Sequence, residues 1–242
     1  MLGSDCLVII PAYNEERNIG RVLKEIRSLK IDLDIVVVDD GSRDGTGAVT
    51  GEAGERVITL PYNLGYGGAL QTGFKYAADM GYNYIIQFDA DGQHDPEDIP
   101  VILGRLRSGA MDIIIGSRFL GNGSAYAGTL KRTAIWLFRF LIKISTGVRI
   151  TDPTSGLQGL TCRAFSHYAA RGNYPEDFPD ADTLIGMILS GYRVTEFPAN
   201  IRERISGRSM HSGVRTVFYF IKMLVSILVV FIREKTKAEG SQ

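Results

Sequence analysis

The chain has 242 residues, 45% of them hydrophobic and 22% charged, which fits a single α/β domain with a substantial core. Its 27 basic and 27 acidic side chains cancel, so we expect no nucleic-acid partner. Two cysteines without metal-ligand spacing argue against a metal centre built on thiolates, and we expect Cys6 and Cys162 to be reduced and buried.

Charge is unevenly distributed along the chain. Residues 1–112 hold 10 basic and 18 acidic side chains, residues 113–151 hold six basic ones and no acid, and residues 198–242 hold eight basic and three acidic ones. The acidic first half suggests a metal or polar ligand, and the two cationic segments suggest anions or a membrane surface.

Apolar runs alternate with amphipathic segments in the first half of the chain. We expect strands at 6–14, within 33–46, and at 56–61, 82–90 and 111–117, with helices at 15–30, 46–53, 68–80 and 96–108. This alternation is typical of a mainly parallel sheet covered by helices on both faces. After it we expect a basic aromatic helix at 130–146, a turn-rich loop at 152–159, a strand at 192–198, a polar loop at 202–212 and a long apolar helix at 214–233.

The carboxyl ends of the predicted strands are where such a sheet binds ligands. They read PAYNE, DDGS, FDADGQ and GSR. Asp89 and Asp91 are two residues apart and can point to one side, where a divalent cation would offset their repulsion; oxygen ligands suit Mg²⁺ or Mn²⁺. The alternative is a solvated acidic turn. For Asp95 we favour a structural role as the N-cap of the next helix, with Pro96 as its first residue.

The ordered set of motifs carries a family resemblance. PAYNEE, VVVDDGSRDGT, NLGYGGALQTGF, FDADGQHDP and GSR, in this order and spacing, resemble the inverting family 2 glycosyltransferases of the GT-A fold. The likeness is to the branch of dolichol-phosphate mannose synthases and bacterial polyprenyl-phosphate glycosyltransferases. It implies a Rossmann-like catalytic domain at 1–212, followed at 213–242 by a membrane-associated or partner-binding helix and a polar tail.

The resemblance also implies roles for individual residues. Five residues would contact the base and ribose of a nucleotide-sugar donor: Pro11, Tyr13, Glu15, Val38 and Asp40. The metal and diphosphate would be held by Asp89, Ala90, Asp91 and Gln93, with Asp89, Asp91 and Gln93 near the ion. Phosphates would be bound by Arg118, Arg132 and Arg204. Met210 stands where related enzymes carry a lysine, and Arg208 is the cation expected to replace it. The alternative for Arg118 and Arg132 is a surface cation without a ligand.

The acceptor decides whether a base is needed. In the resembling enzymes an acidic residue falls at Asp182, with Asp180 as its neighbour, and it would deprotonate a hydroxyl acceptor. A phosphate monoester is already an anionic nucleophile at pH 7, so cations would serve it better than a base. The arginines of 202–212 favour the phosphate acceptor.

Two helices suggest contact with a membrane. The segment 130–146 combines basic with aromatic and aliphatic residues, which suits a helix in the headgroup layer. The apolar stretch 217–232 is short for a span, so we expect it to lie in the interface or dock on a partner, with a core or oligomer helix and a true span as alternatives. A small integral membrane protein would then supply the anchor, and a homo-oligomer is a further option.

The sequence therefore predicts an inverting, metal-dependent glycosyltransferase. It would move a sugar from a UDP- or GDP-sugar to undecaprenyl or dolichyl phosphate at the cytoplasmic membrane face, with Asp91 and Arg118 acting on the leaving diphosphate and the incoming phosphate. One alternative is transfer to a glycan or sugar hydroxyl with Asp182 as base. The other is a non-catalytic, sugar-nucleotide-binding membrane scaffold.

Overall fold

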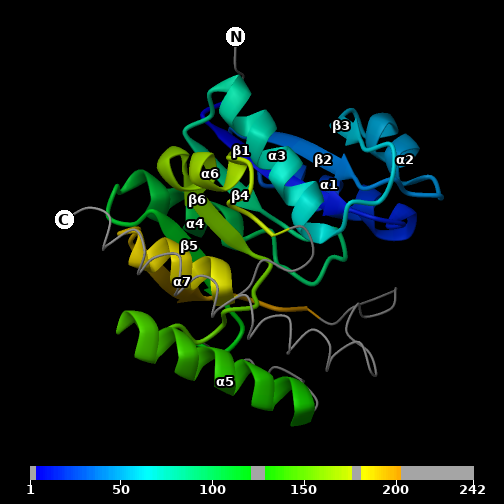
Figure 1. Ribbon diagram of the computed structural model, residues 1–242. Coiled ribbons are helices and arrows are strands. Elements are labelled where there is room, and N and C mark those ends of the chain that lie inside the picture. Colours follow the sequence, from blue (N-terminus) through cyan, green and yellow to red (C-terminus); the bar gives the residue numbers. More distant parts are fainter. Residues whose placement is uncertain (1–3, 121–128, 176–180, 203–242) are drawn as a thin grey trace.

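A seven-stranded sheet forms the centre of the computed structural model, which describes residues 4–120, 129–175 and 181–202 (Figure 1). Its strands are β1 (Cys6–Ala12), β2 (Asp34–Asp39), β3 (Arg56–Thr59), β4 (Tyr84–Gln87), β5 (Ile113–Ser117), β6 (Gln158–Thr161) and β7 (Val194–Pro198). Their order is β3-β2-β1-β4-β6-β5-β7, and only β6 runs antiparallel to its neighbours. The predicted mainly parallel α/β sheet is thus confirmed.

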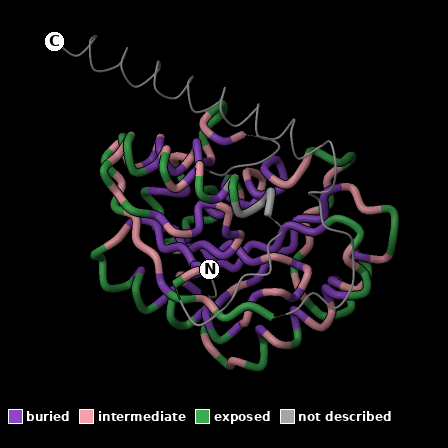
Figure 2. Tube along the Cα trace, turned by 90° about the horizontal axis from the view of Figure 1, so that it is seen from below, coloured by how far each residue is buried: buried purple, intermediate pink, exposed green. Residues whose placement is uncertain are grey.

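Helices cover both faces of this sheet. They are α1 (Glu16–Ser28), α2 (Thr46–Glu52), α3 (Tyr66–Met80), α4 (Asp98–Arg107), α5 (Thr129–Thr146), α6 (Cys162–Ala169) and α7 (Ala181–Leu189). Side chains of α1 and α4 pack on one face, and those of α3, α5, α6 and α7 pack on the other. Figure 2 shows the buried strands between these two layers.

The pattern of β1 explains why its sequence is apolar throughout. Successive side chains of a strand point to opposite faces, so Leu7 and Ile9 join one core while Val8 and Ile10 join the other. The helix α3 lies so close to β1 that a Cβ atom at Gly73 would overlap the side chain of Ile9. A glycine is therefore needed there to seat α3 on the sheet.

Three predictions about local structure need correction. The last two residues of the segment expected as a loop, at 152–159, begin β6, and α6 starts directly after this strand. Strand β6 has a single large apolar residue and is buried by its place between β4 and β5. Helix α3 begins at Tyr66 rather than residue 68. Cys6 is buried as expected, but Cys162 is exposed at the start of α6.

The predicted N-cap role of Asp95 also needs correction, because Glu97 holds that position and α4 begins at Asp98 rather than Pro96. The carboxylate of Asp95 instead accepts the amide of Glu97 at 3.1 Å, in the turn before the helix. Within the described ranges, we find no helix with the length and hydropathy of a membrane span. The apolar stretch 217–232 and the domain boundary at 212 lie outside these ranges and stay predictions.

Candidate functional site

One edge of the sheet gathers the polar strand ends. Because β1, β2, β4 and β5 point the same way, PAYNE, DDGS, FDADGQ and GSR meet along this edge. Residues 151–157 lead into the antiparallel β6 at the same edge, between β4 and β5. The gathering predicted from the sequence is therefore present.

Asp89, just after β4, is fixed at both carboxylate oxygens. Oδ1 accepts the hydroxyl of Tyr66 at 2.8 Å, and Oδ2 lies 3.1 Å from Nε2 of His94. Its side chain also lies against Gly156, where a Cβ would overlap it. Burial would raise the pKa of Asp89, but hydrogen bonds from His94 and Tyr66 and the charges of His94 and Arg118 outweigh it and lower the pKa below its usual value. Asp89 is therefore an oriented, ionised carboxylate.

His94 is a site residue for which no motif predicted a role. It is buried, and its ring packs edge-on against Phe88 at 5.7 Å between centroids. An ionised carboxylate can only accept, so Nε2 carries the proton toward Asp89. The other ring nitrogen, Nδ1, is buried and has no hydrogen-bond partner among the described residues. The sequence signal for this contact is that His94 follows Asp89 five residues later, within FDADGQHDP.

Asp91 and Gln93 follow on the same loop. The amide of Gln93 donates to Oδ1 of Asp91 at 2.9 Å, which turns this carboxylate back over the loop. Within the described ranges no three His, Cys, Asp or Glu side chains are grouped so as to hold a metal ion by themselves. Two carboxylates and an amide instead suit Mg²⁺ or Mn²⁺, which complete their shells with phosphate oxygens and water. The donor set fits the predicted ion, and the roles of Ala90, which is buried, and of Gln93 stay predictions.

Asp40 has a role that the resemblance did not indicate. Its buried carboxylate accepts the amides of Leu64 at 2.7 Å and Gly65 at 3.0 Å, the two residues before α3. Burial raises the pKa of Asp40 despite these two bonds. The next carboxylate back along the chain, Asp39, accepts the amide of Ser42 at 3.0 Å. Asp40 thus holds the glycine-rich loop, and its predicted contact with a base stays untested.

The other predicted nucleotide residues differ in accessibility. Tyr13 is exposed and Glu15 is half-buried, with its carboxylate accepting from Asn18 at 2.6 Å. Pro11 is buried in β1. Val38 is fully buried in β2, so a contact between Val38 and a nucleotide would require the surrounding chain to move.

Arg118 pairs with a carboxylate from the loop before β6. Its Nε and Nη2 each lie 2.6 Å from an oxygen of Asp152, and Nη2 also bonds the carbonyl of Thr154 at 3.0 Å. Asp152 has no exposed surface, so this is an internal ion pair that closes the loop onto β5. The predicted phosphate contact of Arg118 stays a prediction, with Asp152 as its existing partner.

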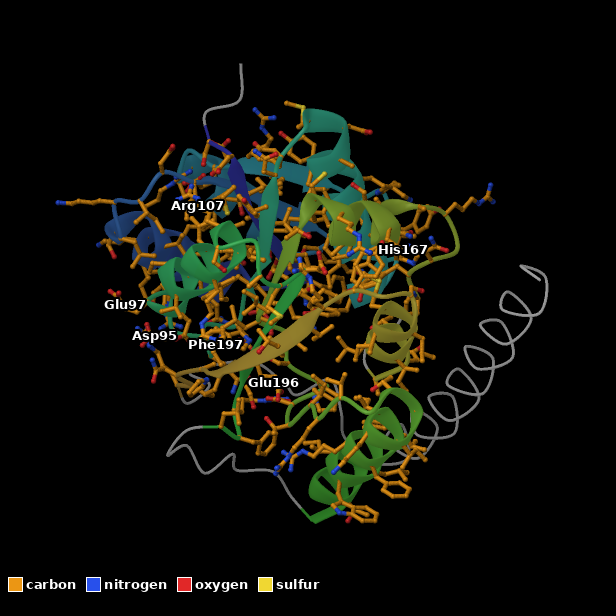
Figure 3. All side chains as sticks on the ribbon, turned by 90° about the vertical axis from the view of Figure 1, so that its left-hand side faces the viewer. Asp95, Glu97, Arg107, His167, Glu196 and Phe197 are labelled. Atoms are coloured by element: carbon orange, nitrogen blue, oxygen red, sulfur yellow. The ribbon has the colours of Figure 1, made fainter. Side chains whose placement is uncertain are left out.

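The same loop is held from two further elements. Glu196 of β7 accepts the amides of Thr151 at 2.6 Å and Asp152 at 2.7 Å; Figure 3 shows Glu196 and Phe197 as neighbours on this strand. Burial raises the pKa of Glu196 although both amides oppose the rise. Nε of Arg139, on α5, donates to the carbonyl of Thr151 at 2.6 Å.

The loop of residues 89–95 is joined to the chain beyond β7. Figure 3 places Asp95 near the end of β7, and Arg202 donates its amide to the carbonyl of Gln93 at 2.8 Å. The guanidinium of Arg202 pairs with Asp95 at 2.9 Å and with Glu25 of α1 at 2.7 Å. Arg202 is therefore engaged with acids of this chain.

Asp182 lies in the first turn of α7 and is buried. Its Oδ1 accepts the amide of Thr183 at 2.9 Å. Its role as a base stays a prediction. Arg204, Arg208, Met210 and Asp180 lie outside the described residues, as does the side chain of Arg132.

Comparisons with known proteins agree with this architecture. The model of glycosyl transferase family 2 matches residues 7–171. An undecaprenyl-phosphate mannosyltransferase of Micrococcus luteus is 33% identical over 86% of this chain and 87% of its own. A polyprenol monophosphomannose synthase of Mycolicibacterium smegmatis is 32% identical over 86% of this chain and 81% of its own.

A solved structure shows the same fold. Glucosyl-3-phosphoglycerate synthase of Mycobacterium tuberculosis, in complex with Mn²⁺, UDP-glucose and phosphoglyceric acid, has a TM-score of 0.69 over 94% of this chain and 80% of its own, at 19% identity. The sheet with its polar edge and the match of the family model over most of the chain lead to one conclusion. The chain is a glycosyltransferase and belongs to glycosyl transferase family 2.

Proposed function

We propose that the protein transfers one sugar from a nucleotide-diphosphate donor to a polyprenyl phosphate, with inversion at the anomeric carbon. The main support is its similarity, over more than four fifths of the chain, to two relatives whose names give a polyprenyl phosphate or polyprenol as acceptor. The carboxylates of Asp89 and Asp91, which are oriented by hydrogen bonds just after β4, would supply the matching donor site.

Asp89, Asp91 and Gln93 would hold Mg²⁺ or Mn²⁺, which would neutralise charge on the departing diphosphate. Tyr66 and His94 keep Asp89 oriented and ionised for this task. Asp40 fixes the loop before α3, and the pairing of Arg118 with Asp152 holds residues 151–157 against the end of β5. The lipid phosphate would attack the sugar in line and needs no base.

We place the reaction at the cytoplasmic face of a membrane, with the protein peripheral or anchored by a partner. Support for the contact with a membrane comes from α5, where Trp136, Phe140 and Ile144 are exposed by 63%, 49% and 62% and recur every fourth residue along one face. The rings of Trp136 and Phe140 stack with centroids 5.9 Å apart, and Lys143 is exposed next to this stripe. Such a face suits the headgroup layer of a bilayer.

The proposal is tested with purified protein, a panel of UDP- and GDP-sugars, and undecaprenyl or dolichyl phosphate. Mass spectrometry should find a glycosyl phospholipid, formed only with Mg²⁺ or Mn²⁺. Asp91→Asn should lower turnover by at least about a hundredfold, because the charge opposite the diphosphate is lost, while thermal unfolding changes little. Wild-type rates in Asp91→Asn would rule out the metal assignment.

The same assay separates the alternatives. A product on a glycan or sugar hydroxyl that disappears in Asp182→Asn would favour the enzyme with a carboxylate base. A protein that binds the donor and releases no nucleoside diphosphate would be a binding scaffold.

A further inference from the structure

Tyr66 lies between the acidic ends of β2 and β4, and no motif predicted a role for it there. It is the first residue of α3, and its hydroxyl lies between the ends of two side chains from the β4 region. Nε2 of Gln87 donates to this hydroxyl at 3.0 Å, and the hydroxyl lies 2.8 Å from Oδ1 of Asp89. These three side chains form a short relay of hydrogen bonds.

The direction of the relay follows from the donors available. A phenol has one hydrogen, and the ionised carboxylate of Asp89 can only accept. The hydrogen of Tyr66 therefore points to Asp89, and the amide nitrogen of the buried Gln87 must face the phenol oxygen. A phenol keeps its proton at neutral pH, so Tyr66 stays a donor.

The backbone on either side gives Tyr66 little freedom. Asp40 accepts the amides of Leu64 and Gly65 immediately before it, and the Tyr66 ring packs against the core covered by α3. Gln87 is on a strand paired with β1, opposite Ile9. A rigid donor on one side and a fixed loop on the other thus hold the phenol at a set distance from Asp89.

We propose that Tyr66 is a positioning residue for the metal and diphosphate site. With Gln87 behind it, Tyr66 fixes Oδ1 of Asp89 while His94 fixes Oδ2, which leaves the remaining lone pairs of the carboxylate for the ion and its ligands. This inference deepens the proposed function and depends on it for the identity of the ligand. It links Asp40 of the DDGS motif to Asp89 of the FDADGQ motif through the loop that ends at Tyr66.

The test measures Mn²⁺ binding by electron paramagnetic resonance, with UDP and with GDP present, beside steady-state turnover. Tyr66→Phe keeps the ring and removes only the hydroxyl, so Mn²⁺ affinity should fall about tenfold, the range expected for one charge-assisted hydrogen bond. Tyr76→Phe is the matched control on the same helix, because that hydroxyl accepts from Arg56 at the surface. It should leave Mn²⁺ affinity unchanged.

A second pair of variants tests the relay itself. Gln87→Met should weaken Mn²⁺ binding less than Tyr66→Phe, since Tyr66 can still donate to Asp89. If Gln87 acts through Tyr66, the double variant should bind Mn²⁺ as Tyr66→Phe does, whereas independent packing effects would add.

Each outcome decides one question. Tyr66→Phe with wild-type Mn²⁺ affinity, or additive losses in the double variant, would overturn the positioning role. A wild-type protein that binds no Mn²⁺ with either nucleotide would instead refute the metal assignment of the proposed function.

Discussion

Asp152 is the most completely enclosed charge at the site. It has no exposed surface, and both of its oxygens face Arg118, whose side chain is 21% exposed. Breaking a buried ion pair by removing one partner is costly, because the remaining charge stays desolvated. Asp152 therefore stabilises the loop before β6 as much as it shapes the site.

Asp152→Asn should lower the free energy of unfolding by about 3 kcal/mol, measured by urea denaturation. The matched control is Asp95→Asn, which removes a partly exposed partner of Arg202 and should cost at most about 1 kcal/mol. Equal losses in the two variants would show that burial adds nothing to the Arg118–Asp152 pair.

Sequence motifs predicted the acidic side chains of the site but not the residues that these side chains contact. The carboxylates of the strand ends were predictable, because acids that end buried strands need a reason to be there. Their partners were not: Arg118 finds Asp152 34 positions along the chain, and Tyr66 reaches Asp89 across 23. A motif gives the type of side chain at a position, whereas its partner depends on how distant loops meet.

At the scale of elements, α5 has one side in the core and another facing outward. Phe138 and Ile142 are buried against the sheet-facing core, whereas Trp136, Phe140 and Ile144 are exposed. Figure 1 shows α5 at the outside of the molecule, beyond α7. The free energy falls when a bilayer removes the apolar side chains of such a face from water.

Replacing Trp136, Phe140 and Ile144 together by serine should weaken binding to vesicles of phosphatidylglycerol and phosphatidylcholine by at least about tenfold, as measured by co-sedimentation. The fold should persist, because none of the three is in the core. Val101→Ser with Met80→Ser, two exposed apolar residues on other helices, provides the control. Undiminished vesicle binding by the serine variant would exclude α5 as the contact.

Long elements with strong periodicity were predictable, whereas the short helices α6 and α7 and the strand β6 were missed. Helix α1 places Ile19, Val22, Leu23 and Ile26 in the core at the spacing that its sequence indicates. Strand β6 has only Leu160 as a large apolar residue, and Gly159 is buried because α4 lies directly over it. Tertiary packing, rather than local pattern, makes this segment a strand.

The whole molecule brings the site together from segments far apart in sequence. The ends of β1, β2, β4 and β5 line one edge, and the antiparallel β6 brings residues 151–157 to the same place. The alternation of strands and helices indicated this sheet, but the insertion of β6 between β4 and β5 left no local trace. A ligand at this edge would contact segments from most of the described chain, so its binding should oppose unfolding of the entire sheet.

Ligand binding to the folded state alone raises stability by mass action, by about 2.7 kcal/mol at a hundredfold excess over Kd. For a chain of this size, that gain corresponds to a rise in Tm of about 5–10 °C. We expect this rise with UDP or GDP plus Mn²⁺ in thermal unfolding of the wild-type protein. The nucleotide alone should give little, because the carboxylates of Asp89 and Asp91 would repel its diphosphate when no cation lies between them.

Chelation of Mn²⁺ by EDTA should reverse the rise, and Asp91→Asn should abolish the part that depends on Mn²⁺ while keeping the Tm of the free protein. An equal rise in Tm with and without Mn²⁺ would mean that the nucleotide binds away from Asp89 and Asp91. In that case, cations of the chain rather than a bound ion would have to balance the diphosphate charge.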